Sequence, residues 1–273
     1  MVLDYDEVLL DAADGLQPLP TSVLELVAAS ARADTEVADV AAILETDPTL
    51  LAHVLREANS VGLGARGAVA TANDAVVRLG TGRIAAVAVF TSVGDTFDQP
   101  VGPYNLEPGA FGNHAFLALS AGAALRSATK GLLPNEITTA CVLHDIGKLV
   151  IASTLRGVDQ SLFERIHEFA VDWTTIERDL VGVDHGEVGR VILEQWNLPS
   201  SIATAVQYHH RAAEGDSLLA HGVALADGLV HRVTDPDREF SPEAQQAAEV
   251  LGLGSDALAL VASSIVPEAS DDA

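Results

Sequence analysis

The stretch ITTACVLHDIGKLVI, residues 137–151, is the part of the sequence that decides the fold and the site. It is apolar almost all round, and a helix of that kind is expected to be buried. Yet it carries His144, Asp145 and Lys148 within little more than one turn, and His144 and Lys148 share a face at i and i+4. A buried carboxylate is costly unless it is paired, protonated or bound to a cation. The stretch therefore predicts a buried polar site around His144 and Asp145.

The rest of the chain predicts an all-α fold, because apolar residues recur with the period of a helix and few segments alternate like strands. Asp47-Pro48 is a strong helix start, since the aspartate caps free amides and the proline fits the first turn. Asp34 or Thr35 is expected to cap the helix that precedes the one starting at Asp47-Pro48. The other helices are predicted at about residues 21–32, 47–59, 71–79, 82–93, 111–127, 134–154, 160–180, 185–196, 199–210 and 217–233.

Breaks in this pattern predict how the chain is divided. Residues 95–108 contain three prolines and Gly102, which is typical of a connection between two lobes. We therefore expect an N-terminal helical lobe at 1–98 and a second helical lobe at 105–234. A C-terminal extension at 235–273 is expected to hold two short amphipathic helices and a frayed tail, and the glycine-rich residues 62–67 are expected to form a loop.

Composition narrows the class of protein. The chain has 273 residues, of which 48% are hydrophobic, and a formal net charge of −24. This charge repels phosphate and argues against nucleic acid or an anionic membrane as a partner. We see no membrane span and no secretory signal. Cys141 is the only cysteine, so we expect a small buried side chain, no disulfide and no cysteine-based zinc site, in a protein of the cytoplasm.

Further ionisable side chains fall on the apolar faces of other predicted helices. These are His114, His185, His209, His210 and Asp227. We ask of each histidine whether it falls on the apolar stripe of its helix, a criterion called the stripe test below. It assigns His53 and His221 to the surface and leaves His167 and His231 undecided, because these two lie at the edges of the apolar stripes.

Imidazole nitrogens and carboxylate oxygens together suit a divalent transition metal such as Mn, Fe, Zn or Ni. Adjacent histidine and aspartate point about 100° apart on a helix, so both reach one ion only at a helix junction, or else they bridge two ions.

Each of these residues also has an ordinary alternative role. A single histidine on an apolar face is more often a satisfied core residue, Lys148 is a natural ion-pair partner for Asp145, and Asp227 is placed to cap a neighbouring helix. The joint occurrence of these residues favours one shared site.

These residues resemble the HD superfamily of metal-dependent phosphohydrolases. More specifically, the chain is similar to HDOD proteins, the HD-related output domains of bacterial signalling. The resemblance is carried by His114, Leu143-His144-Asp145-Ile146-Gly147-Lys148, His185, His209-His210 and Asp227, together with the segments Leu16-Gln17-Pro18-Leu19-Pro20, Asp47-Pro48-Thr49-Leu50, Asn59-Ser60, Ala75 to Gly80 and Trp196-Asn197-Leu198-Pro199.

The resemblance implies an N-terminal helical lobe packed against an HD-like lobe, with a metal site formed by His114, His144, Asp145, His185, His209, His210 and Asp227. It also implies two different functions. The first is a regulatory module that binds a protein partner or a ligand in a signalling pathway. The alternative is a phosphohydrolase acting on a nucleotide or another phosphoester, with Asp145 and Lys148 as catalytic residues and Lys148 stabilising the transition state.

Two absences bear on this choice. The Gly-Tyr-Pro segment of the related cyclic dinucleotide phosphodiesterases does not follow His209-His210, where Arg211-Ala212-Ala213 stands instead. No glycine loop of the phosphate-binding type is found, and no arginine cluster is expected near the site. The sequence therefore favours the regulatory function over hydrolysis.

Overall fold

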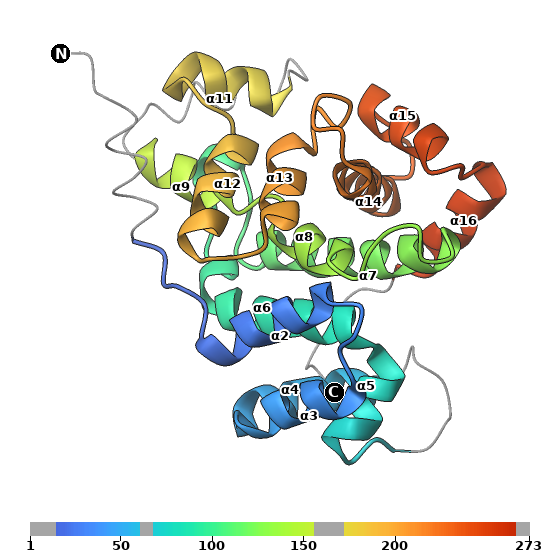
Figure 1. Ribbon diagram of the computed structural model, residues 1–273. Coiled ribbons are helices and arrows are strands. Elements are labelled where there is room, and N and C mark those ends of the chain that lie inside the picture. Colours follow the sequence, from blue (N-terminus) through green and yellow to red (C-terminus); the bar gives the residue numbers. More distant parts are fainter. Residues whose placement is uncertain (1–14, 61–67, 156–171, 266–273) are drawn as a thin grey trace.

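Helix α6 (Thr81–Phe97) lies between the N-terminal helices and the rest of the fold (Figure 1). The computed structural model describes residues 15–60, 68–155 and 172–265. In these ranges the chain is helical, as predicted, apart from connections and one isolated antiparallel bridge between Val101 and Leu106. The side chains of α6 are buried from Ile84 to Val89. A helix buried all round in this way joins the helices packed on its two sides.

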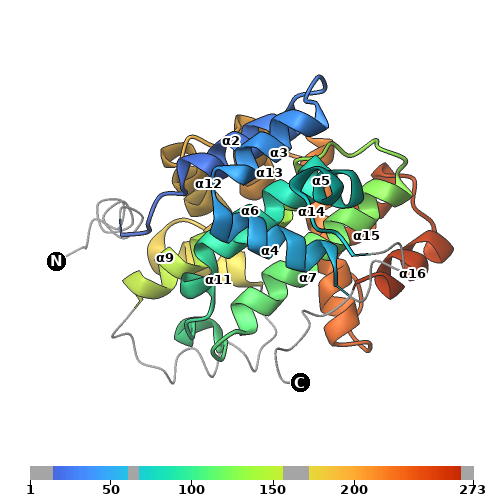
Figure 2. The same cartoon turned by 90° about the horizontal axis from the view of Figure 1, so that it is seen from below.

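Four helices cover one side of α6: α2 (Thr21–Ala31), α3 (Val37–Glu45), α4 (Pro48–Ala58) and α5 (Ala72–Leu79). Helices α2, α4 and α5 contact α6 directly, whereas α3 packs on α2, α4 and α5. Seen from below, the N-terminal helices and α6 lie in front of the other helices (Figure 2).

The predicted starts of these helices are partly confirmed. Asp47 caps α4, since its Oδ1 accepts the N–H of Leu50 at 3.0 Å. The prediction that Asp34 or Thr35 caps α3 is wrong. Glu36 is the cap, in a reciprocal capping box with Asp39. The Thr35 hydroxyl instead donates to the carbonyl oxygen of Ala29 at 2.7 Å, at the end of α2.

On the other side of α6 lie the helices that carry the site. These are α7 (Ala110–Ala128), α8 (Ile137–Leu143), α9 (Gly147–Thr154), α11 (Trp173–Val181), α12 (His185–Gln195), α13 (Ser200–Tyr208) and α14 (Leu218–Thr234). Helix α8 contacts α6, α7, α13 and α14, so it is surrounded. The C-terminal helices α15 (Pro242–Val250) and α16 (Ser255–Ser263) pack on α14, and α16 also packs on α7.

The predicted helix at 134–154 is interrupted. Residues 144–146 form a turn with helical backbone angles at His144 and Ile146, and α9 begins at Gly147. By length and composition Ile137–Thr154 could cross a membrane, as could α5 and α6 taken together across a bend of 108°. However, 78% of the Ile137–Thr154 window is buried inside the fold, which is the pattern of a core helix.

The prediction that His221 lies on the surface is wrong. His221 is only 8% exposed, because α14 is packed by α7, α8, α13 and α15 and is buried on nearly every face between Leu219 and Ala226. His53 on α4 is half-buried. The stripe test assumes one buried face, and this assumption fails for a helix with neighbours all round.

The connection between the predicted lobes contains a short 3-10 helix, η2 (Gly102–Tyr104), and buries the ring of Tyr104. The division of the chain at residues 98, 105 and 235 stays a prediction. The predicted loop at 62–67, most of the predicted helix at 160–180, His167 and the C-terminal tail lie outside the described residues.

Candidate metal centre

His144 and Asp145 lie in the turn between α8 and α9, which is the helix junction that the sequence required if both were to face one site. His144 is 1% exposed and Asp145 is 7% exposed. In this turn the side chains converge, with 3.5 Å between His144 Nε2 and Asp145 Oδ2. Gly147 makes the junction possible, because the start of α9 lies directly against the backbone of His185 at the start of α12.

The first half of the centre, half-site 1, is formed by His114 from α7, His144 and Asp227 from α14. The Nε2 atom of His114 lies 3.2 Å from His144 Nε2 and 3.2 Å from Asp227 Oδ1. His144 Nε2 is 3.7 Å from the same Asp227 oxygen. Asp145 Oδ2 faces this group, 3.8 Å from His114 Nε2.

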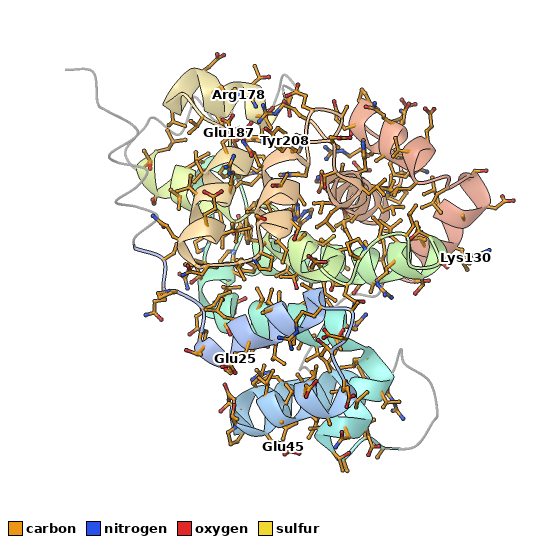
Figure 3. The ribbon with its side chains drawn as sticks, in the orientation of Figure 1. Glu25, Glu45, Lys130, Arg178, Glu187 and Tyr208 are labelled. Carbon is orange, nitrogen blue, oxygen red and sulfur yellow. The ribbon has the colours of Figure 1, made fainter. Side chains whose placement is uncertain are left out.

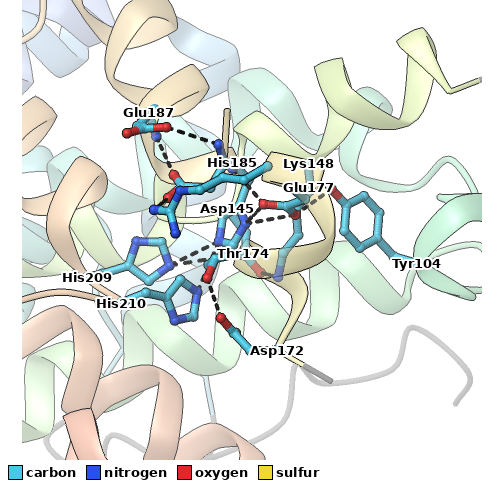
Figure 4. Close-up of polar contacts among 12 residues, drawn as sticks. Tyr104, Asp145, Lys148, Asp172, Thr174, Glu177, His185, Glu187, His209 and His210 are labelled. Atoms are coloured by element: carbon cyan, nitrogen blue, oxygen red, sulfur yellow. Dashed lines mark hydrogen bonds and ion pairs between the residues drawn. The ribbon is translucent and has the colours of Figure 1, made fainter. Parts of the chain in front are cut away.

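The second half, half-site 2, is formed by His185, His209 and His210 (Figure 4). His185 begins α12, and the histidine pair follows α13. His185 Nε2 lies 3.3 Å from His209 Nε2 and 3.1 Å from His210 Nε2. The other oxygen of Asp145, Oδ1, faces this group at 3.3 Å from His185 Nε2 and 4.0 Å from His209 Nε2. The structure thus brings all seven predicted ligands together, with Asp145 between the two half-sites.

In three histidines the nitrogen that points away from the centre, Nδ1, is held by a hydrogen-bond acceptor. His144 Nδ1 donates to the carbonyl oxygen of Cys141 at 2.8 Å, and His209 Nδ1 donates to that of Val206 at 2.6 Å. His185 Nδ1 donates to the Glu177 carboxylate at 2.7 Å. A neutral imidazole carries one proton, so each of these rings turns an unprotonated Nε2 toward the centre. This arrangement is the one that metal-ligating histidines adopt.

Two further observations fit a bound cation. The unprotonated Nε2 atoms of His185 and His209 lie 3.3 Å apart and repel each other unless a positive charge lies between them. With metal–ligand bonds of about 2.0–2.2 Å, neighbouring ligand atoms lie about 2.8–3.6 Å apart, from octahedral to tetrahedral angles. Asp145 Oδ1 is also buried without a hydrogen-bond partner among the described residues. The donor set and the spacing therefore fit divalent ions.

The charges of the centre suit ligation. Burial lowers the pKa of His209, as do the neighbouring His210 and His144, and the pKa of His210 falls to about 4 through burial and the charge of His185. Burial alone would raise the pKa of Asp145, but His144, Lys148 and His185 lower it well below its usual value. At neutral pH Asp145 is therefore ionised and His209 and His210 are neutral, which are the forms that bind metal. Burial alone would lower the pKa of His144, but Asp145 and Asp227 raise it above its usual value.

Lys148 is the ion-pair partner of Asp145, as the sequence allowed. Its Nζ donates to Asp145 Oδ2 at 2.7 Å and lies 5.8 Å from the ring centre of Tyr104. Burial alone would lower the pKa of Lys148, but Asp145 raises it above its ordinary value. The ammonium group is therefore a fixed positive charge at the edge of the centre.

Sequence reasoning missed the groups that support half-site 2. Glu177 on α11 is 1% exposed and accepts from both the backbone N–H and the ring of His185. Tyr104 in η2 donates to Glu177 Oε1 at 2.7 Å (Figure 4). Glu177 lies on the buried face of its helix beside Ile176 and Val181, so the stripe test applied to this helix would have found it.

The expectation that no arginine cluster lies near the site is also wrong. Arg178 and Arg211 both pair with Asp184, the residue before His185, and Arg211 also reaches Glu187 at 3.4 Å. Arg178 and Glu187 lie at the same end of the molecule as Tyr208 (Figure 3). Arg178 lies on α11 and Arg211 in the loop after α13, so their proximity is tertiary. They are paired with carboxylates and hold the start of α12 in place.

Comparisons with known proteins agree with this fold. In sequence, the chain is 22% identical over 202 residues to an uncharacterized protein of Treponema pallidum; the match covers 73% of this chain and 38% of that protein. Among solved structures it is similar to an HDOD domain protein of unknown function from Geobacter sulfurreducens, with a TM-score of 0.67, 21% identity, and 94% and 92% of the two chains covered.

Two other solved structures are similar. One is a candidate phosphohydrolase from Shewanella amazonensis, with a TM-score of 0.65, 25% identity, and 94% and 93% of the chains covered. The other is a candidate signal transduction protein from Marinobacter aquaeolei, with a TM-score of 0.63 and 20% identity. The match covers 96% of this chain and 64% of that protein.

A family model, the HDOD domain, matches residues 16–212. This range is more than half of the chain and includes every residue of the two half-sites except Asp227. The chain therefore belongs to the HDOD family.

Proposed function

We propose that this HDOD protein is a metal-dependent phosphohydrolase acting on a nucleotide or another phosphoester. The observation that carries the proposal is the Asp145 carboxylate, which turns Oδ2 toward half-site 1 and Oδ1 toward half-site 2. A carboxylate with a histidine group at each oxygen is suited to hold two divalent ions side by side. The sequence favoured a regulatory function, and the convergence of the predicted ligands around Asp145 is what supports hydrolysis.

In this proposal His114, His144 and Asp227 hold one ion, His185, His209 and His210 hold the other, and Asp145 is shared. When bound at these residues, divalent ions would supply polarisation of a phosphoryl group and a lowered pKa for bound water. The identity of the metal among Mn, Fe, Zn and Ni is open, since each accepts imidazole and carboxylate ligands.

Lys148 supplies a fixed positive charge beside the carboxylates of the centre. Its ammonium group lies 2.7 Å from Asp145 and stays protonated at neutral pH. A phosphoryl group gains negative charge as it is attacked, and a fixed ammonium beside it stabilises that charge. The relative from Shewanella amazonensis, described as a candidate phosphohydrolase, supports the same reaction class.

The test is a screen of the metal-free protein and of samples reloaded with each of the four metals. Substrates are phosphomonoesters, phosphodiesters, nucleotides and cyclic nucleotides. We expect metal-dependent turnover that falls at least about 100-fold in Asp145→Asn. Lys148→Met is expected to keep its metal and lose about 10- to 1000-fold in kcat. Asp256→Asn, which makes the same change at an exposed site on α16, is the control. Metal-loaded protein without turnover on any substrate class would contradict hydrolysis.

A second candidate function is that of a regulatory module with a protein partner, and one observation favours it. Tyr104, in the connection between the predicted lobes, bonds to Glu177, which in turn holds His185 of half-site 2. Occupancy of the centre would then alter the connection and the surface beside it. The relative from Marinobacter aquaeolei, described as a candidate signal transduction protein, agrees with this function.

Hydrogen exchange tests this second function. We expect metal to slow amide exchange in residues 98–109 of the wild-type protein and to do so less in Tyr104→Phe, which lacks the hydroxyl. Phe90→Tyr, a change of the opposite kind on α6, serves as the control. Identical exchange with and without bound metal would contradict a regulatory link through Tyr104.

A further inference from the structure

His231 lies beside half-site 1 but has a different relation to it from that of the other histidines. It is one turn beyond Asp227 on α14, and its Nε2 lies 3.3 Å from Asp227 Oδ1. Its ring centre is 5.3 Å from that of His114. Its side chain is 36% exposed, which places it at the solvent edge of the centre. His231 is not among the residues whose donor atoms converge in half-site 1 or half-site 2.

Arg238 determines where the proton of His231 lies. Its Nη1 is 3.3 Å from His231 Nδ1. A guanidinium group donates hydrogen bonds and has no acceptor, so Nδ1 must be the accepting nitrogen. The single proton of the neutral ring is then on Nε2, which faces Asp227. In His144, His185 and His209 the proton is on Nδ1 and Nε2 is free.

We infer that His231 is a positioning residue, which is held by Arg238 and turns its protonated Nε2 toward Asp227 instead of binding a metal itself. A protonated Nε2 has no lone pair for a metal, but it fixes one oxygen of a ligating carboxylate. Glu177 has the complementary role at half-site 2, where a carboxylate accepts from a ligating histidine. The inference rests on the proposed metal centre.

This arrangement gives the segment between α14 and α15 a part in the site. Arg238 lies in that segment, and His231 and Asp227 lie, like it, beyond residues 16–212 that the family model matches. The C-terminal extension therefore supports half-site 1 from outside the matched domain. Arg232 is a matched control for Arg238, since it is an exposed arginine of the same region that lies over the Phe240 ring, 5.1 Å from its centre.

The first arm of the test measures the tautomer and needs no metal. Long-range ¹⁵N–¹H spectra of the metal-free protein near pH 8 identify His231 by the signals lost in His231→Gln. We expect the His231 proton on Nε2 in the wild type and in Arg232→Met, and a shift toward Nδ1 in Arg238→Met. A wild-type His231 that is protonated on Nδ1 would overturn the inference.

The second arm measures affinity by competing Zn²⁺ or Mn²⁺ against a chelator. We expect His231→Phe to weaken one of the two binding events about 10- to 100-fold and to leave the other unchanged. Arg238→Met should act in the same direction with a smaller effect, Arg232→Met should have none, and His231→Gln should recover part of the loss through its amide N–H. Circular dichroism checks that each variant folds.

The two arms separate the inference from the proposed function. A wild-type protein that binds no metal contradicts the proposed function, and the tautomer then decides whether Arg238 and His231 still hold Asp227. A wild-type protein that binds two ions, with His231→Phe binding both equally well, overturns the inference and leaves the proposed function standing.

Discussion

Gly147 lies so close to the carbonyl oxygen of His185 that a Cβ atom at position 147 would be 2.0 Å from that oxygen. The same Cβ would be 2.9 Å from the backbone nitrogen of Gly189. Both contacts are with backbone, which cannot turn aside as a side chain can. This approach of α9 to α12 is what places Asp145 Oδ1 3.3 Å from His185 Nε2. The glycine that follows the His-Asp pair is thus a requirement of the site's geometry.

Gly147→Ala is therefore expected to lower the free energy of unfolding by at least about 1–3 kcal/mol, the usual cost of overpacking. It should also weaken metal binding, because Asp145 and His185 must move apart. Denaturant unfolding and metal titration measure the two effects. Gly94→Ala on α6 is the control, since nothing lies within 4 Å of its Cβ position, and it should stabilise the helix by about 0.5–1 kcal/mol. Equal stability of Gly147→Ala and wild type would contradict the close contact.

The shared position of Asp145 predicts an unequal effect of two similar substitutions. Asp145→Asn removes a ligand charge from both half-sites and should abolish most bound metal. Asp227→Asn removes one from half-site 1 only and should leave about one ion of two per chain. Elemental analysis of the purified variants gives the stoichiometry directly. If Asp145→Asn kept as much metal as Asp227→Asn, Asp145 would not link the half-sites.

His221 predicts a pH dependence of stability that is separate from the metal centre. Burial lowers its pKa in the folded protein, and its Nδ1 is buried without a partner among the described residues. Because the unfolded chain then takes up the proton first, its stabilising contribution is present above about pH 6.5 and is lost as the pH falls through the folded pKa. His221→Gln should lose less free energy of unfolding than wild type between about pH 7.5 and pH 5.5. Equal losses, measured by denaturant unfolding in chelator, would sink this prediction.

Cys141 should be inert while the protein is folded. Its thiol is fully buried, and burial raises its pKa far above the usual value, with a further contribution from Asp227. Since the thiolate is the reactive form, a thiol reagent at pH 8 should label the denatured protein rapidly and the native protein only at the rate of unfolding. Rapid native labelling would contradict the packing of α8 against α7.

Much of the site was predictable because its ligands interrupt apolar stripes. His114, His185 and Asp227 stand out in this way, and their convergence follows from burial and chemistry together. His231 was undecided on the same test, because it lies at the edge of its stripe and is half-exposed in the structure. Its role depends on Arg238, seven residues away, and no periodicity reports that contact.

The break between α8 and α9 was not predictable from apolar pattern alone. Residues 137–154 carry apolar residues on almost every face, which favours one continuous helix. The interruption is a tertiary effect, since Gly147 packs on the backbone of His185 in another helix. Tyr104 was missed for a similar reason. It lies in a connection rich in proline and glycine, where no helical period exists, and its partner Glu177 is distant in sequence.

The hydrogen bonds at Nδ1 divide the histidines of the centre into three that are anchored and two that are not. His144, His185 and His209 are buried and each is anchored at Nδ1, so their rings cannot turn without breaking a bond. His114 and His210 are half-buried, and among the described residues no hydrogen bond anchors their Nδ1 atoms. Each half-site therefore has one ring that is held only through its Nε2 atom. We expect an ion to reach the proposed centre past these two rings, because they are the more exposed of its five predicted histidine ligands.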